Sequence, residues 1–276
     1  MACKSAAAKT PQTPLKAESF EELMEYCEGI KALVGWAKDD EVVFRGHESS
    51  DWPLEPSLFR FVRVKRGAVR RSDVQSFESL IYYLFAARMA SKLGADQSGW
   101  DYLFHMQHYA VPTRLLDWSE SPGKALWFAC GAQDSKRDSA AAGKAHLPCL
   151  WVLNASALNK TSWGFDESID PNYLCGDSKR SYRDIVANYN AYEFDEPVAV
   201  YPNYLNERMR AQSGLFTTFG NNLGPLEAQV PKAVAKIVLG EKCTAQARRM
   251  GRFYDLNDYE MFPDVQGLAN FIRNEF

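Results

Sequence analysis

The residues best suited to chemistry gather in one stretch, from His105 to Cys130. This stretch combines two histidines, an arginine, an aspartate and a tryptophan in a turn-rich segment that leads into an apolar run. Ser121 and Pro122 predict a helix start, because serine caps free N–H groups and proline fits the first helical position. Those N–H groups carry a partial positive charge and suit an anionic or phosphate-bearing ligand. On the residues alone, a well-capped structural helix remains the leading interpretation.

Arg45 is the next candidate, since it ends an apolar run and precedes Gly46. A guanidinium at a strand end that faces a cleft binds phosphate or carboxylate with two hydrogen bonds. Alternatively, Arg45 pairs with Asp117 or a loop carboxylate, or Arg114 and Asp117, three residues apart, pair with each other. The apolar flanks of the latter two residues predict burial, and buried charges need partners. A structural ion-pair network therefore competes with a ligand site.

Several catalytic classes lack their signatures in this chain. It contains no GxGxxG after a strand, no GxxxxGK[ST], no HExxH, no GxSxG and no zinc-deaminase pattern. His105 and His108 form the only close histidine pair and lack a nearby third ligand, so we expect no metal. The six cysteines are scattered without a CxxC, several within apolar runs, as buried free thiols are in a reducing compartment.

Composition narrows the class of protein further. Hydrophobic residues make up 46% and charged residues 24% of the 276 residues, which is ordinary for a globular protein. The net charge of -3 offers no bulk attraction to nucleic acid or acidic membranes. It does not exclude a local basic groove. No apolar run approaches membrane-spanning length, so we expect a cytoplasmic protein with no membrane partner.

Hydrophobic periodicity predicts the elements that position these residues. We expect a flexible tail over 1–18 and one α+β domain over 19–276, with an insertion or lid about 154–195. The longest predicted helix has an apolar stripe of Phe77, Leu80, Ile81, Leu84, Phe85 and Met89. Predicted helices cover 19–36, 73–93, 100–109, 121–130, 241–250 and 264–276, and predicted strands cover 41–46, 149–153, 197–201, 215–219 and 236–239.

Four segments of the chain resemble the motifs of the FRG domain family. Phe44–Gly46 with Trp52–Arg60 resembles the motif that names the family, and Gln107–Trp118 resembles its longest motif. A third resemblance covers Arg208–Thr217, and Phe262–Asp264 resembles the closing segment. The resemblance spans roughly 20–276.

The order of these motifs is similar to that of ADP-ribosyltransferases, which implies a mixed, split sheet flanked by helices. In that superfamily an arginine or histidine ends the first core strand, a serine or threonine motif precedes a helix, and a glutamate comes late. Arg45 matches the first place, and 113–121 matches the second. Gln212 falls in the third motif, but Gly214 stands where the glutamate is expected.

The resemblance implies an NAD-dependent ADP-ribosyltransferase-like enzyme or an NAD hydrolase. NAD would be the substrate, the acceptor a protein or nucleic acid, and the family's genomic setting suggests a toxin or anti-phage effector. The implied catalytic residues are Arg45, Asp117 and Gln212. The implied NAD-binding residues are Arg45, Gly46, His108, Tyr109, Thr113, Arg114, Trp118 and Ser121.

Two other interpretations stay open at this stage. The domain could be a non-catalytic nucleotide- or nucleic-acid-binding regulatory module that uses basic segments at 60–71 and 242–252. Alternatively, the motifs could mainly build the folding core, a role that buried tryptophan, proline and paired arginine residues serve well.

Overall fold

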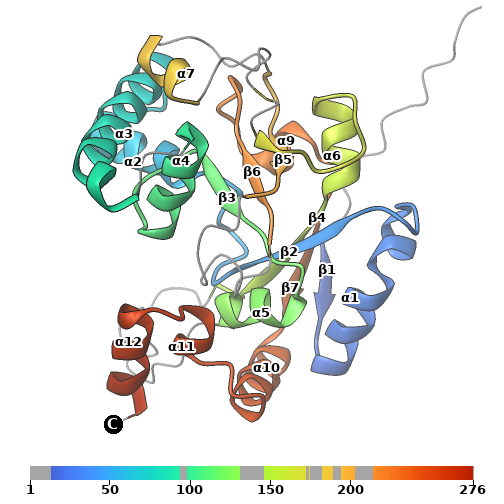
Figure 1. The fold of residues 1–276 in the computed structure, drawn as a ribbon. Coiled ribbons are helices and arrows are strands. Elements are labelled where there is room, and N and C mark those ends of the chain that lie inside the picture. The colour runs from blue at the N-terminus through green and yellow to red at the C-terminus, as the bar shows by residue number, and fades with distance from the viewer. Residues whose placement is uncertain are drawn as a thin grey trace, which may run out of the picture.

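Two β-sheets lie at the centre of the molecule, and helices pack around them in an α+β arrangement (Figure 1). The computed structural model describes residues 14–93, 98–130, 146–171, 174, 182–188, 194–202 and 214–275. Within this part of the chain, no helix has both the length and the apolar character needed to cross a membrane.

The first sheet has the strand order β1-β7-β4-β2. Its strands are β1 (Leu15–Ala17), β7 (Val234–Leu239), β4 (Cys149–Asn154) and β2 (Val42–His47). The β1 and β7 strands are parallel and the other pairs are antiparallel, so the sheet is mixed, as expected. The expectation of a loose tail over 1–18 is wrong at its end, because 15–17 gain a ladder of backbone hydrogen bonds to β7.

The second sheet is antiparallel and joins β3 (Leu115–Asp117), β6 (Phe216–Thr218) and β5 (Val198–Val200) in that order. An isolated bridge connects it to the first sheet. The Phe44 N–H donates to the Ser119 carbonyl at 2.7 Å, and the Ser119 N–H donates back at 2.8 Å. The bridge therefore brings Arg45 and Asp117, one residue and two residues away from it, to the same junction.

Apart from α6 and α9, the described helices fall into three groups (Figure 1). The α2, α3, α4 and α7 helices lie beside the second sheet, α1, α5 and α10 pack near the first sheet, and α11 packs against α12. Their bounds are α1 Phe20–Val34, α2 Ser57–Arg66, α3 Arg71–Leu93, α4 Gly99–His108, α5 Pro122–Cys130, α6 Ala155–Ser162, α7 Tyr182–Asn188, α9 Leu226–Gln229, α10 Glu241–Phe253, α11 Asp258–Met261 and α12 Val265–Glu275.

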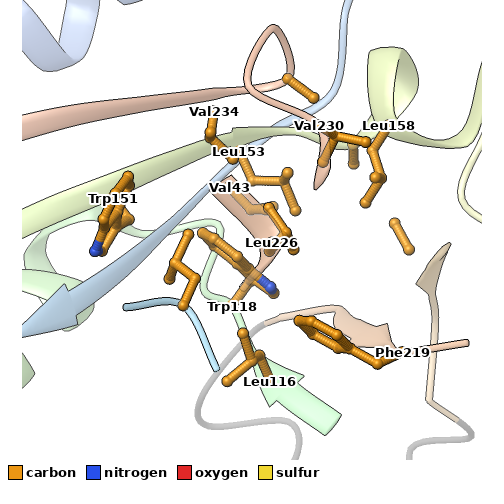
Figure 2. Packing of buried hydrophobic residues seen from close by; sticks show 14 of the residues in the cluster. Val43, Leu116, Trp118, Trp151, Leu153, Leu158, Phe219, Leu226, Val230 and Val234 are labelled. Atoms are coloured by element: carbon orange, nitrogen blue, oxygen red, sulfur yellow. The ribbon is translucent and has the colours of Figure 1, made fainter. Parts of the chain in front are cut away.

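A hydrophobic core ties the two sheets together, and Trp118 lies in its middle (Figure 2). The indole is 3% exposed, and its Nε1–H donates to the Thr217 hydroxyl at 3.1 Å. Burying a large apolar side chain stabilises a fold by roughly 1.5–3 kcal/mol. Because this core spans both sheets, the junction between Phe44 and Ser119 is rigidly supported.

The predicted apolar stripe of α3 is partly wrong. Leu80 and Leu84 are 55% and 46% exposed, whereas Val74, Glu78 and Tyr82 form the buried face. These three lie four residues apart, as one face of a helix requires. Hydrophobic periodicity missed this face because its central residue is an acid, which a buried arginine neutralises.

Only the first part of the predicted insertion or lid at 154–195 lies largely within the described chain. Asn159 of α6 donates to the Ala199 carbonyl at 2.9 Å, and its Oδ1 accepts from the Ala199 N–H at 2.7 Å. This part is therefore bonded to β5 and belongs to the body of the fold.

Candidate functional site

A pocket of about 670 Å³ opens at the junction of the two sheets. Its walls come from β2 and the loop after it, from α2 and the residues before it, from the end of β3 and from α5. Pockets of roughly 300–1,000 Å³ are typical of small-molecule sites. The lining residues are Phe44, Arg45, Gly46, His47, Glu48, Trp52, Pro53, Glu55, Arg60, Arg63, Asp117, Trp118, Ser119, Ala125 and Phe128.

An ion pair between Arg45 and Asp117 lies in the pocket wall. Arg45 Nη1 donates to Asp117 Oδ2 at 2.9 Å and to the Asp117 backbone carbonyl at 2.8 Å. Asp117 lines the pocket, and 43% of its side-chain surface is accessible. Of the alternatives open from the sequence, pairing of Arg45 with Asp117 is the one that the structure contains.

Gln107 holds the other oxygen of Asp117. The Thr113 hydroxyl donates to Gln107 Oε1, and Gln107 Nε2 donates to Asp117 Oδ1. Because the threonine hydroxyl occupies the amide oxygen, the amide nitrogen must face the carboxylate. Burial opposes ionisation of Asp117, but the charge of Arg45 and these hydrogen bonds outweigh it and lower the pKa of Asp117. The pocket therefore contains a preoriented, ionised carboxylate.

His47 supports Arg45 from the other side. Arg45 Nε donates to His47 Nε2 at 3.2 Å, so the acceptor nitrogen carries no proton. Burial, followed by the positive charge of Arg45, lowers the pKa of His47 to about 3. The imidazole is therefore neutral at physiological pH and acts as an acceptor that orients Arg45.

A second set of charges comes from α2 and the residues before it. Glu55 is 3% exposed and pairs with both terminal nitrogens of Arg63. Arg60 donates from Nη1 to the backbone carbonyl of Glu55. Burial and then the positive charge of Arg45 lower the pKa of Arg60. Arg45 and Arg60 both line the pocket.

Two glycines of the motifs have packing roles. A Cβ at Gly46 would overlap the backbone carbonyl of Ala125, so glycine allows β2 and α5 to touch. A Cβ at Gly214 would overlap the backbone carbonyl of Trp118. Position 214 therefore has no room for a side chain.

Arg114 lies in the interior rather than in the pocket. Its side chain is 3% exposed, and it pairs with Glu78 of α3, whose side chain is 6% exposed. Arg114 Nη1 also donates to the carbonyls of Phe219 at 2.5 Å and Gly220 at 3.1 Å. The alternative of a structural ion-pair network is confirmed for Arg114, although its partner is not Asp117.

Four of the remaining predicted residues are not among those that line the pocket. Thr113 is 1% exposed, Tyr109 is 56% exposed and lies against Phe85, and Ser121 caps α5 by accepting from the Lys124 N–H at 3.3 Å. His108 is partly exposed and contacts the ring of its neighbour Tyr109. Gln212 is outside the residues that the structure describes. The ligand roles expected for these five residues stay predictions.

His47, Trp52 and Glu55 line the pocket but were not predicted from the sequence to be functional. Arg60 and Arg63 were considered only as part of the basic segment 60–71 of the nucleic-acid-binding alternative. Trp52, Glu55 and Arg60 lie within the first FRG-like motif, so the motif was recognised while their chemistry was not. Gln107 begins the second motif and was likewise not assigned a role. Across the described chain, no three His, Cys, Asp or Glu side chains are arranged to hold a metal ion.

The comparisons with known proteins concern the same segment. Residues 40–138 match the model of the FRG domain. All residues that line the pocket lie within this range. No curated protein and no solved structure matches the chain.

Proposed function

We propose that the pocket binds NAD or a closely related nucleotide and that the protein transfers ADP-ribose to an acceptor or to water. The observation that carries this proposal is the ionised, accessible Asp117 held between Arg45 and Gln107 in the pocket wall. A nucleotide offers phosphates for arginine, a base for aromatic walls and a ribose for a carboxylate. All three kinds of partner line this pocket.

The proposed reaction breaks the bond between the ribose C1′ and the nicotinamide nitrogen. Nicotinamide leaves with the bonding electron pair, and positive charge develops on the ribose. The Asp117 carboxylate would stabilise that charge, since a fixed anion in a recessed site costs little reorganisation. The acceptor oxygen or nitrogen then bonds to C1′ and releases its proton to solvent.

Asp117 takes the place of the carboxylate that the third motif lacks. A side chain does not fit at Gly214, because it would overlap the Trp118 carbonyl. The proposal therefore assigns the electrostatic role to β3 instead of β6. In the proposed reaction Arg45 has two roles. It keeps Asp117 ionised, and it offers positive charge to the ligand.

The test compares wild-type protein with Asp117→Asn during incubation with NAD and cell extract. Nicotinamide release is followed by chromatography, and ADP-ribose incorporation by labelled NAD. The substitution keeps the shape and removes the charge, so we expect a loss of roughly 100- to 1,000-fold in rate, the range for removing one electrostatic group. Glu120→Gln is the matched control, since Glu120 is exposed and does not line the pocket.

Two results would contradict the proposal. Absence of NAD binding by calorimetry, together with absence of nicotinamide release, would refute it as a whole. Wild-type turnover in Asp117→Asn would refute the role of Asp117. NAD binding without turnover would instead support a non-catalytic nucleotide-binding module.

The nucleic-acid-binding alternative has less support in the fold. The basic segments at 60–71 and 242–252 fall mainly on α2 and α10, which lie at opposite ends of the view in Figure 1. Among the described helices, α2 and α10 are not neighbours. We therefore propose nucleic acid only as one kind of acceptor.

A cytoplasmic toxin or anti-phage effector is the biological role that fits such chemistry, because loss of NAD stops growth. Expression of the wild-type chain in bacteria should arrest growth and lower cellular NAD. Expression of Asp117→Asn at equal protein level should do neither. Equal growth arrest by the wild type and Asp117→Asn would show that toxicity does not depend on the proposed reaction.

A further inference from the structure

The charges that line the pocket do not pair off completely. Three arginines and three carboxylates face it, and two arginines are paired, Arg63 with Glu55 and Arg45 with Asp117. The third carboxylate, Glu48, is exposed and has contacts of its own. Among the described carboxylates, none forms an ion pair with Arg60, so its positive charge faces the pocket without direct neutralisation.

Arg60 is nonetheless held in place. Its Nη1 donates to the backbone carbonyl of Glu55, a dipole that orients the guanidinium without cancelling its charge. Its neighbours on α2, Leu58, Phe59 and Val62, are fully buried in the core. The helix that carries Arg60 is therefore fixed, and only the side chain beyond it reaches into the pocket.

A second cation faces the same space. Arg45 and Arg60 both line the pocket, so two guanidinium groups of like charge border one cavity. Burial and then the charge of Arg45 lower the pKa of Arg60, although Glu55 and Asp117 act in the other direction. The neutral His47 beside Arg45 adds no further charge there. An anion placed between the two guanidinium groups would offset this like charge and accept hydrogen bonds from both. Guanidinium and phosphate match in geometry as well as in charge.

From this arrangement we infer that Arg60, with Arg45, forms a phosphate subsite that selects phosphorylated nucleotides over nucleosides. The inference rests on the proposed function for the identity of the nucleotide, but the phosphate contact can be tested without it. The subsite combines Arg60 of α2 with Arg45 of β2, and Asp117 lies beside it as the ion-pair partner of Arg45. The two arginines would contact the phosphate, and Asp117 would contact the ribose. Phosphate recognition and the proposed ribose contact would therefore use separate side chains.

The experiment measures binding of three probes by calorimetry: inorganic pyrophosphate, ADP and adenosine. Wild-type protein should bind pyrophosphate and should bind ADP more tightly than adenosine. Arg60→Gln keeps a polar amide at this position and removes the charge. We expect it to weaken ADP and pyrophosphate binding about ten- to a hundred-fold, the range for one charge-assisted hydrogen bond, and to leave adenosine binding unchanged.

Arg70→Gln is the matched control, because Arg70 follows the same helix, is exposed and does not line the pocket. It should bind all three probes as the wild type does. Thermal unfolding followed by circular dichroism checks that both variants fold. Raised salt should weaken ADP binding to the wild type and Arg70→Gln more than to Arg60→Gln.

The possible failures are distinguishable. Equal ADP and pyrophosphate binding by wild type and Arg60→Gln would overturn the subsite, even if NAD is cleaved. Loss of pyrophosphate binding in Arg60→Gln would support the subsite, even if the protein neither binds nor cleaves NAD. In that second case the proposed function fails and the phosphate contact stands.

Discussion

Replacing Arg114 with methionine should destabilise the protein strongly, because this arginine neutralises a buried acid. Arg114 Nε lies 2.5 Å from Glu78 Oε1, and its Nη2 donates to the other carboxylate oxygen. The Tyr182 hydroxyl also donates to Glu78 Oε1 at 2.5 Å. The group therefore joins β3 to α3 and α7 through charge and hydrogen bonds.

The expected magnitude follows from what the substitution leaves behind. Methionine fills a similar volume but removes the donors to Glu78 and to the carbonyls of Phe219 and Gly220. The carboxylate, whose side chain is 6% exposed, then stays buried without its cation. Breaking a buried pair from one side costs roughly 3–5 kcal/mol, a large share of the 5–15 kcal/mol by which typical domains are stable.

Urea unfolding followed by tryptophan fluorescence measures this loss. The double variant Arg114→Met/Glu78→Gln removes the stranded charge and keeps an acceptor for the Tyr182 hydroxyl. It should therefore be more stable than Arg114→Met alone by roughly 0.5–3 kcal/mol, the usual range of coupling between contacting residues. Arg70→Met, an exposed arginine, should change stability by no more than about 0.5 kcal/mol.

One result would refute this reasoning. If Arg114→Met unfolded within about 1 kcal/mol of the wild type but lost NAD binding, Arg114 would be a ligand contact, as the family resemblance implied. If it unfolded early and the double variant recovered, the arginine would be structural. The two results cannot both occur, so the experiment decides between the two roles.

Two further predictions concern His47 and Gly214. The pKa of His47 falls from 6.5 to about 3, so the stability that its neutral form contributes is complete above pH 6.5 and is lost as pH falls toward 3. When the pH is lowered from 7 to 5, the free energy of unfolding, measured with urea, should therefore fall by about 2 kcal/mol less in His47→Gln than in the wild type. The same pH dependence of unfolding free energy in both proteins would contradict this. Gly214→Ala should cost about 1–3 kcal/mol and lower the melting temperature, because its Cβ overlaps the Trp118 carbonyl. Gly251→Ala is the control, since a Cβ at this position meets no atom within 4 Å. Alanine in place of a helical glycine should raise the stability slightly. Equal melting temperatures of the two variants would disprove the packing argument.

Much of the local structure could be predicted from the sequence. Ser19 caps α1 by accepting from the Glu22 N–H, as the capping pattern indicated, and α5 starts at the predicted Ser121–Pro122 step. The strands around 41–46, 149–153 and 236–239 are confirmed within one or two residues. Capping and hydrophobic alternation act between near neighbours, so the sequence displays them directly.

The sequence also determined which segments make the pocket, although not which of their side chains line it. Arg45 and Asp117 were both named, and their pairing was one of the alternatives. Which carboxylate pairs with Arg45 and which with Arg114 is decided by the tertiary structure. The bridge between Phe44 and Ser119 brings Arg45 to Asp117, while Arg114 on the opposite side of β3 meets Glu78 of α3.

Only the tertiary structure decided which charges remain available to a ligand. In sequence, Arg60 and Arg63 are two similar cations of one basic segment, and the buried Glu78 looks like a solvated helix residue. The fold pairs Arg63 with Glu55, places Arg60 in the same pocket lining as Arg45, and turns Glu78 inward to Arg114. Neutralisation depends on distances of a few ångströms between residues far apart in the chain, and the fold alone sets those distances.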